Sequence, residues 1–289
     1  MDSRTYENNA EAIEAWDTVL FDKFSRFRDV LTRGFSIHGD ALLDRHPLRA
    51  GSRVLDVGCG FGDTTLAIAR RVGEGGEAVG IDAAARFIAS ARGDAESAGL
   101  QRAARFVVAD VQSDPLGGPY DRVFSRFGTM FFASPVAALR NARRSLAKGA
   151  LLTMVVWRKK EENALYFDAE QCVLQFVRPP EQTDQLTCGP GPFSMASPDL
   201  VSAQLEAAGF DRIAFERFDA DICIGSSVEE AVDFAMALGP AGEVMRLAGE
   251  EGEKRKGEIV AALRELMVGK VRDGGVYAGT STWLVSARA

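Results

Sequence analysis

The chain has 289 residues, enough to bury a sizeable hydrophobic core, and 46% of them are hydrophobic, an ordinary share for a globular protein. Its 34 basic and 41 acidic side chains give a formal net charge of −7, which offers no electrostatic attraction to a nucleic-acid backbone. No apolar run approaches the ~20 residues that cross a bilayer, and the first residues lack the basic start and apolar core of a signal peptide. We therefore expect a cytoplasmic protein with neither a nucleic-acid nor a membrane partner.

The cysteines carry no metal or disulfide signal. There are four of them, and they stand far apart and form no Cys-x-x-Cys pair: Cys59, Cys172, Cys188 and Cys223. This spacing fits neither a zinc site nor a disulfide framework, so we expect no bound metal and a reducing compartment.

Short apolar segments alternate with helical patterns from Arg53 onward. Strands are predicted over 53–57, 77–82, 104–110, 120–125 and 150–157, and helices over 63–72, 83–98 and 135–147. The strand over 150–157 is too uniformly apolar to face water on either side. Strands that alternate with helices in this way predict a parallel sheet covered on both faces, and the fold class is α/β.

Three segments fall outside this alternation and predict a cap over one end of the sheet. We expect an N-terminal helical lid over 1–50, a cofactor-binding α/β core over 51–157 and a cap segment over 158–197. The remainder, 198–289, completes the sheet with a helix over 198–208, a strand over 212–219 and a last strand over 280–289. A helical insertion is predicted at about 225–272.

The stretch VLDVGCGFGDTT, from Val54 to Thr65, is a glycine-rich turn from a strand to a helix. Such a turn brings bare N–H groups and a positive helix end close to a ligand. A dinucleotide fingerprint would read G-x-G-x-x-G, whereas the glycines here fall at every second position and Asp63 follows them. Asp56 also precedes the turn, and two carboxylates oppose a pyrophosphate. S-adenosylmethionine, which has a cationic amino group and no phosphate, suits these acids better than NAD.

Two further acids stand at predicted strand ends. Asp82 closes the second strand, 20 residues after Gly62, where a carboxylate can accept both hydroxyls of a ribose. Asp110 closes the third strand and could meet the amino group of an adenine. Because ligands of open parallel sheets lie across the carboxyl ends of the strands, we expect these acids to line one site.

The segments VLDVGCGFG, VGID, FVVAD and YDRVFSRFGTMFF together resemble the class I S-adenosylmethionine-dependent methyltransferases, and most closely the branch related to ubiquinone and menaquinone biosynthesis. The resemblance covers Arg53 to Trp157, and residues 192–210 resemble the helix and turn before the sixth strand of that family. It implies a Rossmann-like, seven-stranded and mostly parallel sheet with helices on both faces and an antiparallel last strand. It also implies S-adenosylmethionine as the cofactor.

The resemblance further implies cofactor-binding residues. The methionine end would meet Asp56, Gly58, Cys59, Gly60 and Gly62; the ribose would meet Asp82 and Ala83; the adenine would meet Phe87, Asp110, Val111 and the backbone of Ser125. This chain departs from the family where three alanines follow Asp82 in place of the usual Ser-Pro. The long insertion at 225–272 also prevents the family's substrates from being carried over.

Methyl transfer to oxygen or carbon usually requires a base, and the chain has only two histidines. His38, in the helical segment before the first strand, is the candidate catalytic residue, whereas His46 before Pro47 reads as a helix end. Arg126, directly after the fourth strand, could hold an acidic or carbonyl group of a substrate or tie down its own loop. Tyr6 could close over the cofactor as part of the lid.

Aromatic residues gather in the segments outside the core. They are Trp16, Phe21, Phe24, Phe27, Phe35, Phe131, Phe132, Tyr166, Phe167 and Phe176. This pattern favours an apolar pocket for a small, fairly hydrophobic methyl acceptor such as a polyketide, quinone or phenolic compound. Aromatic residues at helical spacing also serve simply as core.

Four alternatives stay open on the sequence. The first is a methyltransferase for RNA or protein, which would need a basic or extended groove. The second, an arsenic methyltransferase, would use cysteines over the pocket, and the third is a non-catalytic protein that only binds S-adenosylmethionine. The fourth, a short-chain NAD oxidoreductase, should carry a Tyr-x-x-x-Lys pair, and the sequence has none.

Overall fold

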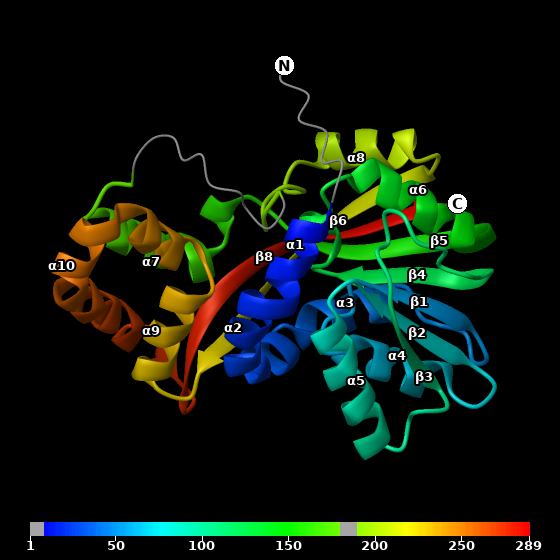
Figure 1. Cartoon of the computed structure of the whole chain (residues 1–289), viewed down its shortest axis with the longest axis horizontal. Coiled ribbons are helices and arrows are strands. Elements are labelled where there is room, and N and C mark those ends of the chain that lie inside the picture. The colour runs from blue at the N-terminus through cyan, green and yellow to red at the C-terminus, as the bar shows by residue number, and fades with distance from the viewer. Residues whose placement is uncertain (1–8, 180–189) are drawn as a thin grey trace.

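The computed structural model describes residues 9–179 and 190–289. Within them a single twisted sheet has the strand order β3-β2-β1-β4-β5-β8-β6, and a short strand, β7, pairs with β8 outside this path (Figure 1). The strands are β1 (Arg53–Val57), β2 (Glu77–Asp82), β3 (Ala104–Val108), β4 (Tyr120–Arg126), β5 (Leu146–Trp157), β6 (Asp211–Gly225), β7 (Val271–Arg272) and β8 (Gly275–Arg288). The α/β fold class is confirmed, but the sheet has eight strands where seven were predicted, because the hairpin before β8 adds a two-residue strand.

The parallel half of the sheet brings the predicted site residues to one edge. β1 is flanked by β2 and β4, and all three run in the same direction. In this register Val57 stands beside Ile81, and Asp82 stands beside Val108. The chain therefore leaves β1, β2 and β3 at the same edge, where the glycine turn, Asp82 and the segment after β3 meet.

Helices cover both faces of the sheet (Figure 1). On one face α3 (Ser36–Arg45), α4 (Asp63–Val72) and α5 (Ala85–Ser97) form a core with strand residues such as Val54, Phe124 and Leu284. On the other face α6 (Pro135–Ser145) and α8 (Pro198–Ala207) pack against the strand residues that point the opposite way, such as Leu55 and Val123. The period-2 alternation of strand side chains divides the apolar residues between these two cores.

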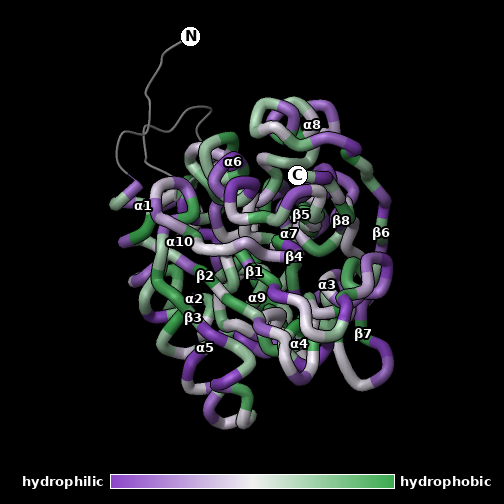
Figure 2. Tube along the Cα trace, turned by 90° about the vertical axis from the view of Figure 1, so that its right-hand side faces the viewer, coloured by the Kyte–Doolittle hydropathy of each residue, from purple (hydrophilic) through white to green (hydrophobic). Residues whose placement is uncertain are grey.

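A long antiparallel ribbon extends the sheet beyond the parallel core. β6 pairs with β8 from Asp211 opposite Arg288 to Gly225 opposite Val276. Both strands are longer than the segments predicted over 212–219 and 280–289. The extension is stabilised because its far end buries Ile222 and Val276 under the inserted helices. Figure 2 shows hydrophilic stretches along the outer strand β6, a feature that disfavours edge-to-edge pairing of sheets.

The inserted helices form a lobe at the end of this ribbon (Figure 1). It consists of α7 (Ala164–Leu174), α9 (Val228–Ala237) and α10 (Pro240–Val268). The block predicted over 225–272 is thus two helices that separate before Pro240, a residue that favours a helix start. Gly249, with φ of 54°, kinks α10.

The N-terminal segment is helical but irregular. It contains α1 (Ala10–Ala15), a π-helical turn (Trp16–Leu20), α2 (Phe21–Arg26), a second π-helical turn (Val30–Gly34) and then α3. In Figure 1 α1 and α2 lie between the sheet and the inserted lobe. Two short 3₁₀ turns, Thr129–Phe131 and Lys160–Glu162, follow β4 and β5. None of the helices in the two described ranges combines the length and the apolar character needed to cross a membrane.

Element ends differ from prediction at two places that matter for the site. The third strand ends at Val108, so Asp110 lies in the loop that follows and does not close the strand. The helix predicted from residue 83 begins at Ala85, because the Asp82 carboxylate accepts a hydrogen bond from the Ala84 N–H at 3.0 Å and holds the two preceding residues outside the helix.

Candidate functional site

The glycine turn after β1 is closely packed against its neighbours. Gly58 and Gly62 have φ angles of 68° and 78°, in the region that favours glycine. A Cβ atom on Gly62 would lie 2.6 Å from the Phe106 ring, and one on Gly58 would lie 2.9 Å from Gly128 Cα. Both positions therefore require glycine for conformation and for space, and the β1 and β4 loops touch backbone to backbone.

The Asp82 carboxylate joins this turn to the start of α5. Oδ2 accepts a hydrogen bond from the Gly60 N–H at 3.0 Å, and Oδ1 accepts one from the Ala84 N–H, with Ala83 lying between. Burial raises the pKa of Asp82, while the two backbone N–H groups oppose that rise. A carboxylate oxygen has two lone pairs, so each oxygen can accept a second hydrogen bond from a ligand hydroxyl. This arrangement fits a ribose that binds between the turn and α5.

Aromatic rings surround Phe87, the residue predicted to lie near the adenine. Phe87 is 3% exposed, and its ring centroid lies 4.8 Å from that of Phe61 and 4.9 Å from that of Phe21. Trp16 and Phe24 approach it at 6.5 and 6.2 Å. The N-terminal segment thus covers the face of α5 where the base was expected. Sequence reasoning missed Phe61, although its place inside the glycine turn was a signal for it.

The segment after β3 is also tied to the N-terminal helices. Asp110 accepts hydrogen bonds from the Gln112 N–H at 2.9 Å and from the Asn9 side chain at 3.1 Å. Val111 is buried, and its carbonyl accepts a hydrogen bond from the Asn141 amide at 2.9 Å. Asp110 lies near the carboxyl edge of the sheet, but its carboxylate already binds protein groups from two sides.

Three predicted cofactor residues lie behind the turn. Asp56 is 1% exposed and accepts a 2.6 Å hydrogen bond from the Thr65 hydroxyl, while burial raises its pKa to about 7. Ser125 is fully buried and donates its hydroxyl proton to the Val57 carbonyl at 2.8 Å. Cys59 is 7% exposed, and burial raises the pKa of its thiol. These side chains hold the turn in shape, and any cofactor contact they make stays a prediction.

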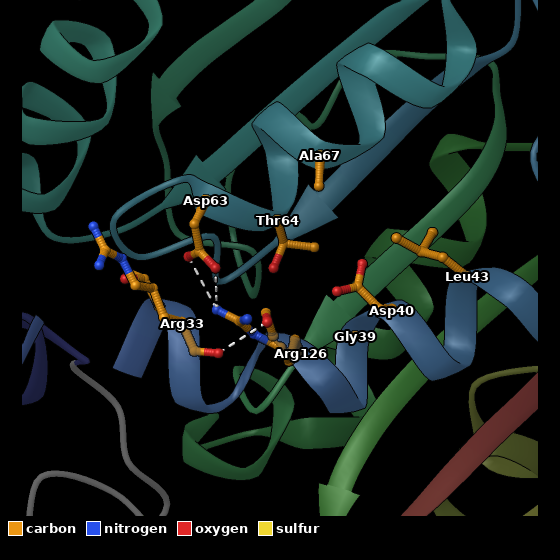
Figure 3. Close-up of a pocket in the computed structure, with 10 residues that line it drawn as sticks. Arg33, Gly39, Asp40, Leu43, Asp63, Thr64, Ala67 and Arg126 are labelled. Atoms are coloured by element: carbon orange, nitrogen blue, oxygen red, sulfur yellow. Dashed lines mark hydrogen bonds and ion pairs between the residues drawn. The ribbon is translucent and has the colours of Figure 1, made fainter. Parts of the chain in front are cut away.

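Arg126 joins the end of β4 to the first residue of α4 and so ties down the glycine turn and not its own loop, while a substrate contact stays a prediction. Its Nη2 donates to both carboxylate oxygens of Asp63 at 3.0 and 2.8 Å (Figure 3). With Asp63 paired and Asp56 driven towards its neutral form, the electrostatic argument against a pyrophosphate is weaker than the sequence suggested. A shallow cavity of about 280 Å³ opens beside this pair. Its lining residues are Thr32, Arg33, Ser36, Gly39, Asp40, Leu43, Asp63, Thr64, Ala67 and Arg126.

His38, the candidate base, is fully buried between α3 and β8. Its Nε2 lies 2.9 Å from the Thr280 hydroxyl, and its Nδ1 lies 3.2 Å from the Thr282 hydroxyl. Burial and the nearby Arg126 guanidinium lower its pKa to about 3, so the ring is neutral at physiological pH. Because both ring nitrogens are engaged by threonines, the geometry gives His38 a packing role, and its catalytic role stays a prediction.

The remaining candidates lie apart from the glycine turn or outside the described ranges. His46 follows α3, and its carbonyl accepts a hydrogen bond from Arg122. Tyr6 and Cys188 fall outside the described residues. Among the residues that are described, no group of His, Cys, Asp and Glu side chains has an arrangement that could hold a metal ion.

Comparison with known proteins agrees with this geometry. Residues 54–149 match the family model described as "Methyltransferase domain". Over this region the chain is similar to methyltransferase domains. The match supports S-adenosylmethionine as its cofactor and confirms the resemblance seen in the sequence motifs. The matched region begins in β1 and ends within β5, so it contains the glycine turn, Asp82, Phe87 and Ser125.

Two relatives and one solved structure extend the comparison. The demethylmenaquinone methyltransferase of Thermus thermophilus is 34% identical over 142 residues, which are 47% of this chain and 63% of that protein. The 2-phytyl-1,4-naphtoquinone methyltransferase of Thermosynechococcus vestitus is 27% identical over 68% of this chain and 90% of its own length. The YcgJ protein of Bacillus subtilis shares the fold, with a TM-score of 0.56 and 18% identity over 88% of this chain and 98% of that one. The match to the Thermus protein thus spans less than two thirds of that relative.

Proposed function

We propose that the chain is an S-adenosylmethionine-dependent methyltransferase that acts on a small, fairly hydrophobic molecule of the natural-product, quinone or phenolic type. The observation that carries the proposal is the Asp82 carboxylate, which binds the Gly60 N–H of the glycine turn inside a methyltransferase domain. A carboxylate at the end of the second strand is the acceptor that a ribose diol requires. The cofactor supplies an electrophilic methyl group when it is bound.

In this proposal different residues at the carboxyl edge of the sheet bind different parts of the cofactor. Asp82 and Ala83 hold the ribose, and Phe87 with the Phe61 ring forms the apolar wall for the adenine. The backbone of the glycine turn faces the methionine end, and the buried Asp56 and Ser125 fix the turn. The N-terminal helices cover the site and exclude water. Exclusion of water favours a reaction whose transition state loses charge, as methyl transfer from a sulfonium does.

The acceptor class rests on the composition of the cap and on the relatives. Two relatives are named for quinone substrates, demethylmenaquinone and 2-phytyl-1,4-naphthoquinone. The segments that cover the carboxyl edge of this sheet contribute aromatic side chains, among them Trp16, which packs against Phe131 at 5.0 Å. An apolar, aromatic site favours a ring compound. The acceptor contacts would come from the three segments 1–50, 158–197 and 225–272, with 51–157 as the cofactor-binding core.

The described cysteines are consistent with a cytoplasmic enzyme. Cys59, Cys172 and Cys223 are all free thiols, and Cys59 is buried. Free thiols persist in a reducing compartment. The formal charge of −7 favours a small acceptor over a nucleic acid.

Calorimetry and a methyl-transfer assay test the proposal together. The protein should bind S-adenosylmethionine or S-adenosylhomocysteine at micromolar level and bind NADH far more weakly. It should then transfer a labelled methyl group to 1,4-naphthoquinol or a simple phenol, with tRNA and a bulk protein as control acceptors. Equal affinity for NADH would remove the basis of the proposal. Binding without turnover on any acceptor would favour the non-catalytic alternative, and turnover on tRNA or protein would favour the macromolecular one.

A further inference from the structure

The cavity between α3 and α4 lies beside the end of the glycine turn (Figure 3). Its volume of about 280 Å³ is below the ~300–1,000 Å³ of sites for drug-sized ligands, so it suits one small molecule. In Figure 3 Asp63 and Arg126 lie at one end of the cavity, and Leu43 lies at the other. Leu43 and Ala67 add apolar surface to the lining, so the cavity has a charged part and an apolar part.

The Thr64 hydroxyl points into this cavity (Figure 3). Thr64 is 6% exposed, and its hydroxyl has no hydrogen-bond partner within the described ranges, 9–179 and 190–289. By contrast, the hydroxyl of the next residue, Thr65, donates to the Asp56 carboxylate. Thr64 also stands in the first turn of α4, and the residue before this helix is Gly62, which has no side chain to cap it. The hydroxyl and the first N–H groups of α4 therefore offer donors to a negatively charged group.

Arg126 supplies positive charge and further donors. Its side chain is 12% exposed and uses only Nη2 for the pair with Asp63. Its Nε and Nη1 have no hydrogen-bond partner among the residues that the structure describes, so both can donate to a ligand. The two acids of the lining are already paired, Asp63 with Arg126 and Asp40 with Arg71 at 2.8 Å. An anion in the cavity would thus meet spare donors and no unpaired carboxylate.

Gly39 of α3 keeps the space between these groups open. A Cβ atom there would lie 3.2 Å from Arg126 Cδ and 4.0 Å from Thr64 Oγ1. Glycine weakens a helix interior relative to alanine, so α3 lacks a side chain at this place at some cost to its own stability. The bare backbone of α3, the Thr64 hydroxyl and the Arg126 side chain therefore surround one space that can hold a small group of atoms.

We propose that this cavity binds a small organic acid, with its carboxylate at Thr64 and Arg126 and its apolar part towards Leu43. The carboxylate accepts hydrogen bonds from the Thr64 hydroxyl, from the spare N–H groups of Arg126 and from the N-terminus of α4. The methionine end of the cofactor also carries a carboxylate, but that group ends the molecule and would leave the apolar lining at Leu43 and Ala67 unfilled. The inference goes beyond the proposed function and does not depend on it.

The test titrates the full chain with two probes that are followed by fluorine NMR. 4-Fluorobenzoate carries the acid group, and 4-fluorotoluene has the same ring without it. Wild type should bind 4-fluorobenzoate about tenfold more tightly than 4-fluorotoluene. Thr64→Val should weaken 4-fluorobenzoate binding about tenfold, the effect of one lost hydrogen bond to a charged group, and leave 4-fluorotoluene binding unchanged. Gly39→Ala should weaken the binding of both probes, because its methyl group fills the cavity, and it decides the test if Thr64→Val does not fold.

The matched control is Thr32→Val, which should bind both probes as wild type does. It removes a hydroxyl from the same cavity, but the proton of that hydroxyl already goes to the Arg28 carbonyl at 2.9 Å. Three outcomes overturn the inference. They are a wild type that binds 4-fluorobenzoate no better than 4-fluorotoluene, unchanged 4-fluorobenzoate affinity in Thr64→Val, and an equal loss in Thr32→Val.

Calorimetry with S-adenosylhomocysteine on the same preparations separates this site from the cofactor site. Wild type and Thr64→Val should bind that product equally, and it should not displace 4-fluorobenzoate. If it displaces the probe and loses affinity in Thr64→Val, the cavity belongs to the cofactor and the inference is wrong. A wild type that binds 4-fluorobenzoate but not S-adenosylhomocysteine would refute the methyltransferase proposal and support this site.

Discussion

Phe27 of the N-terminal segment packs edge to face on Phe234 of α9, with ring centroids 5.5 Å apart. The residues on either side of it reach in opposite directions: Arg26 pairs with Asp233 of the inserted lobe, and Arg28 pairs with Asp94 of α5. The N-terminal segment therefore touches the parts of the chain expected to bind the cofactor and the acceptor.

The lid prediction follows from this position. Deleting residues 1–25 removes Trp16, Phe21 and Phe24 from Phe87 but keeps Phe27, which is 4% exposed and belongs to the main core. We expect the truncated protein to keep a folded sheet and to lose turnover, because water would then reach the reacting groups. In the intact protein, hydrogen exchange should show residues 10–40 gaining protection when S-adenosylhomocysteine is added. A truncated enzyme with normal turnover, or equal protection without ligand, would show that this segment is no lid.

Replacing Asp82 tests the ribose contact. Asp82→Ala should cost about 2–3 kcal/mol of cofactor binding, since a charged acceptor for two hydroxyls is lost. The carboxylate also accepts the Ala84 N–H ahead of α5, so a folding cost of ~1 kcal/mol is expected as well. Calorimetry and urea unfolding would measure the two effects. Glu96→Ala, which removes an exposed acid of α5, is the control, and wild-type cofactor affinity in Asp82→Ala would contradict the assignment.

The buried Asp56 predicts a stability that falls as pH rises. Its folded pKa is raised from 3.8 to about 7, so the folded state keeps a proton that the unfolded chain releases above pH 4. The contribution is complete below the unfolded pKa and is lost as pH rises through about 7. Relative to wild type, Asp56→Asn should gain stability between pH 5 and pH 8, as measured by urea unfolding. Asp199→Asn, which changes an exposed acid, is the control. If the difference in unfolding free energy between Asp56→Asn and wild type stays constant from pH 5 to pH 8, the buried acid is not the source of the pH dependence.

His38 predicts the opposite dependence. Its folded pKa is lowered from 6.5 to about 3, so the stability it contributes is complete above pH 6.5 and is lost as pH falls towards 3. The unfolding cost of His38→Ala should thus be larger at pH 7 than at pH 5, by roughly 2 kcal/mol. Cofactor affinity should stay near wild type if the residue only packs. A His38→Gln protein that is stable and binds cofactor but does not turn over would instead support the catalytic role.

The sequence alone determined the parallel half of the fold and indicated S-adenosylmethionine as the cofactor. β1, α4 and β2 begin and end where the apolar periodicity and the glycines placed them, because strand and helix patterns of 5–10 residues are set by local contacts. The turn at Gly58 and Gly62 was also readable, since no other residue type meets its φ angles and its contacts with Phe106 and Gly128.

Only the tertiary structure decided what surrounds that turn. Asp56 is buried against Thr65, 9 positions away, and Arg126 pairs with Asp63, 63 positions away. His38 is enclosed by two threonines of β8, of which Thr282 is 244 positions away. The aromatic cover of Phe87 likewise depends on segments far apart in the chain. The sequence gives the type and charge of each side chain, but packing sets its solvation and its partners, and these decide whether an acid is charged or a histidine is accessible.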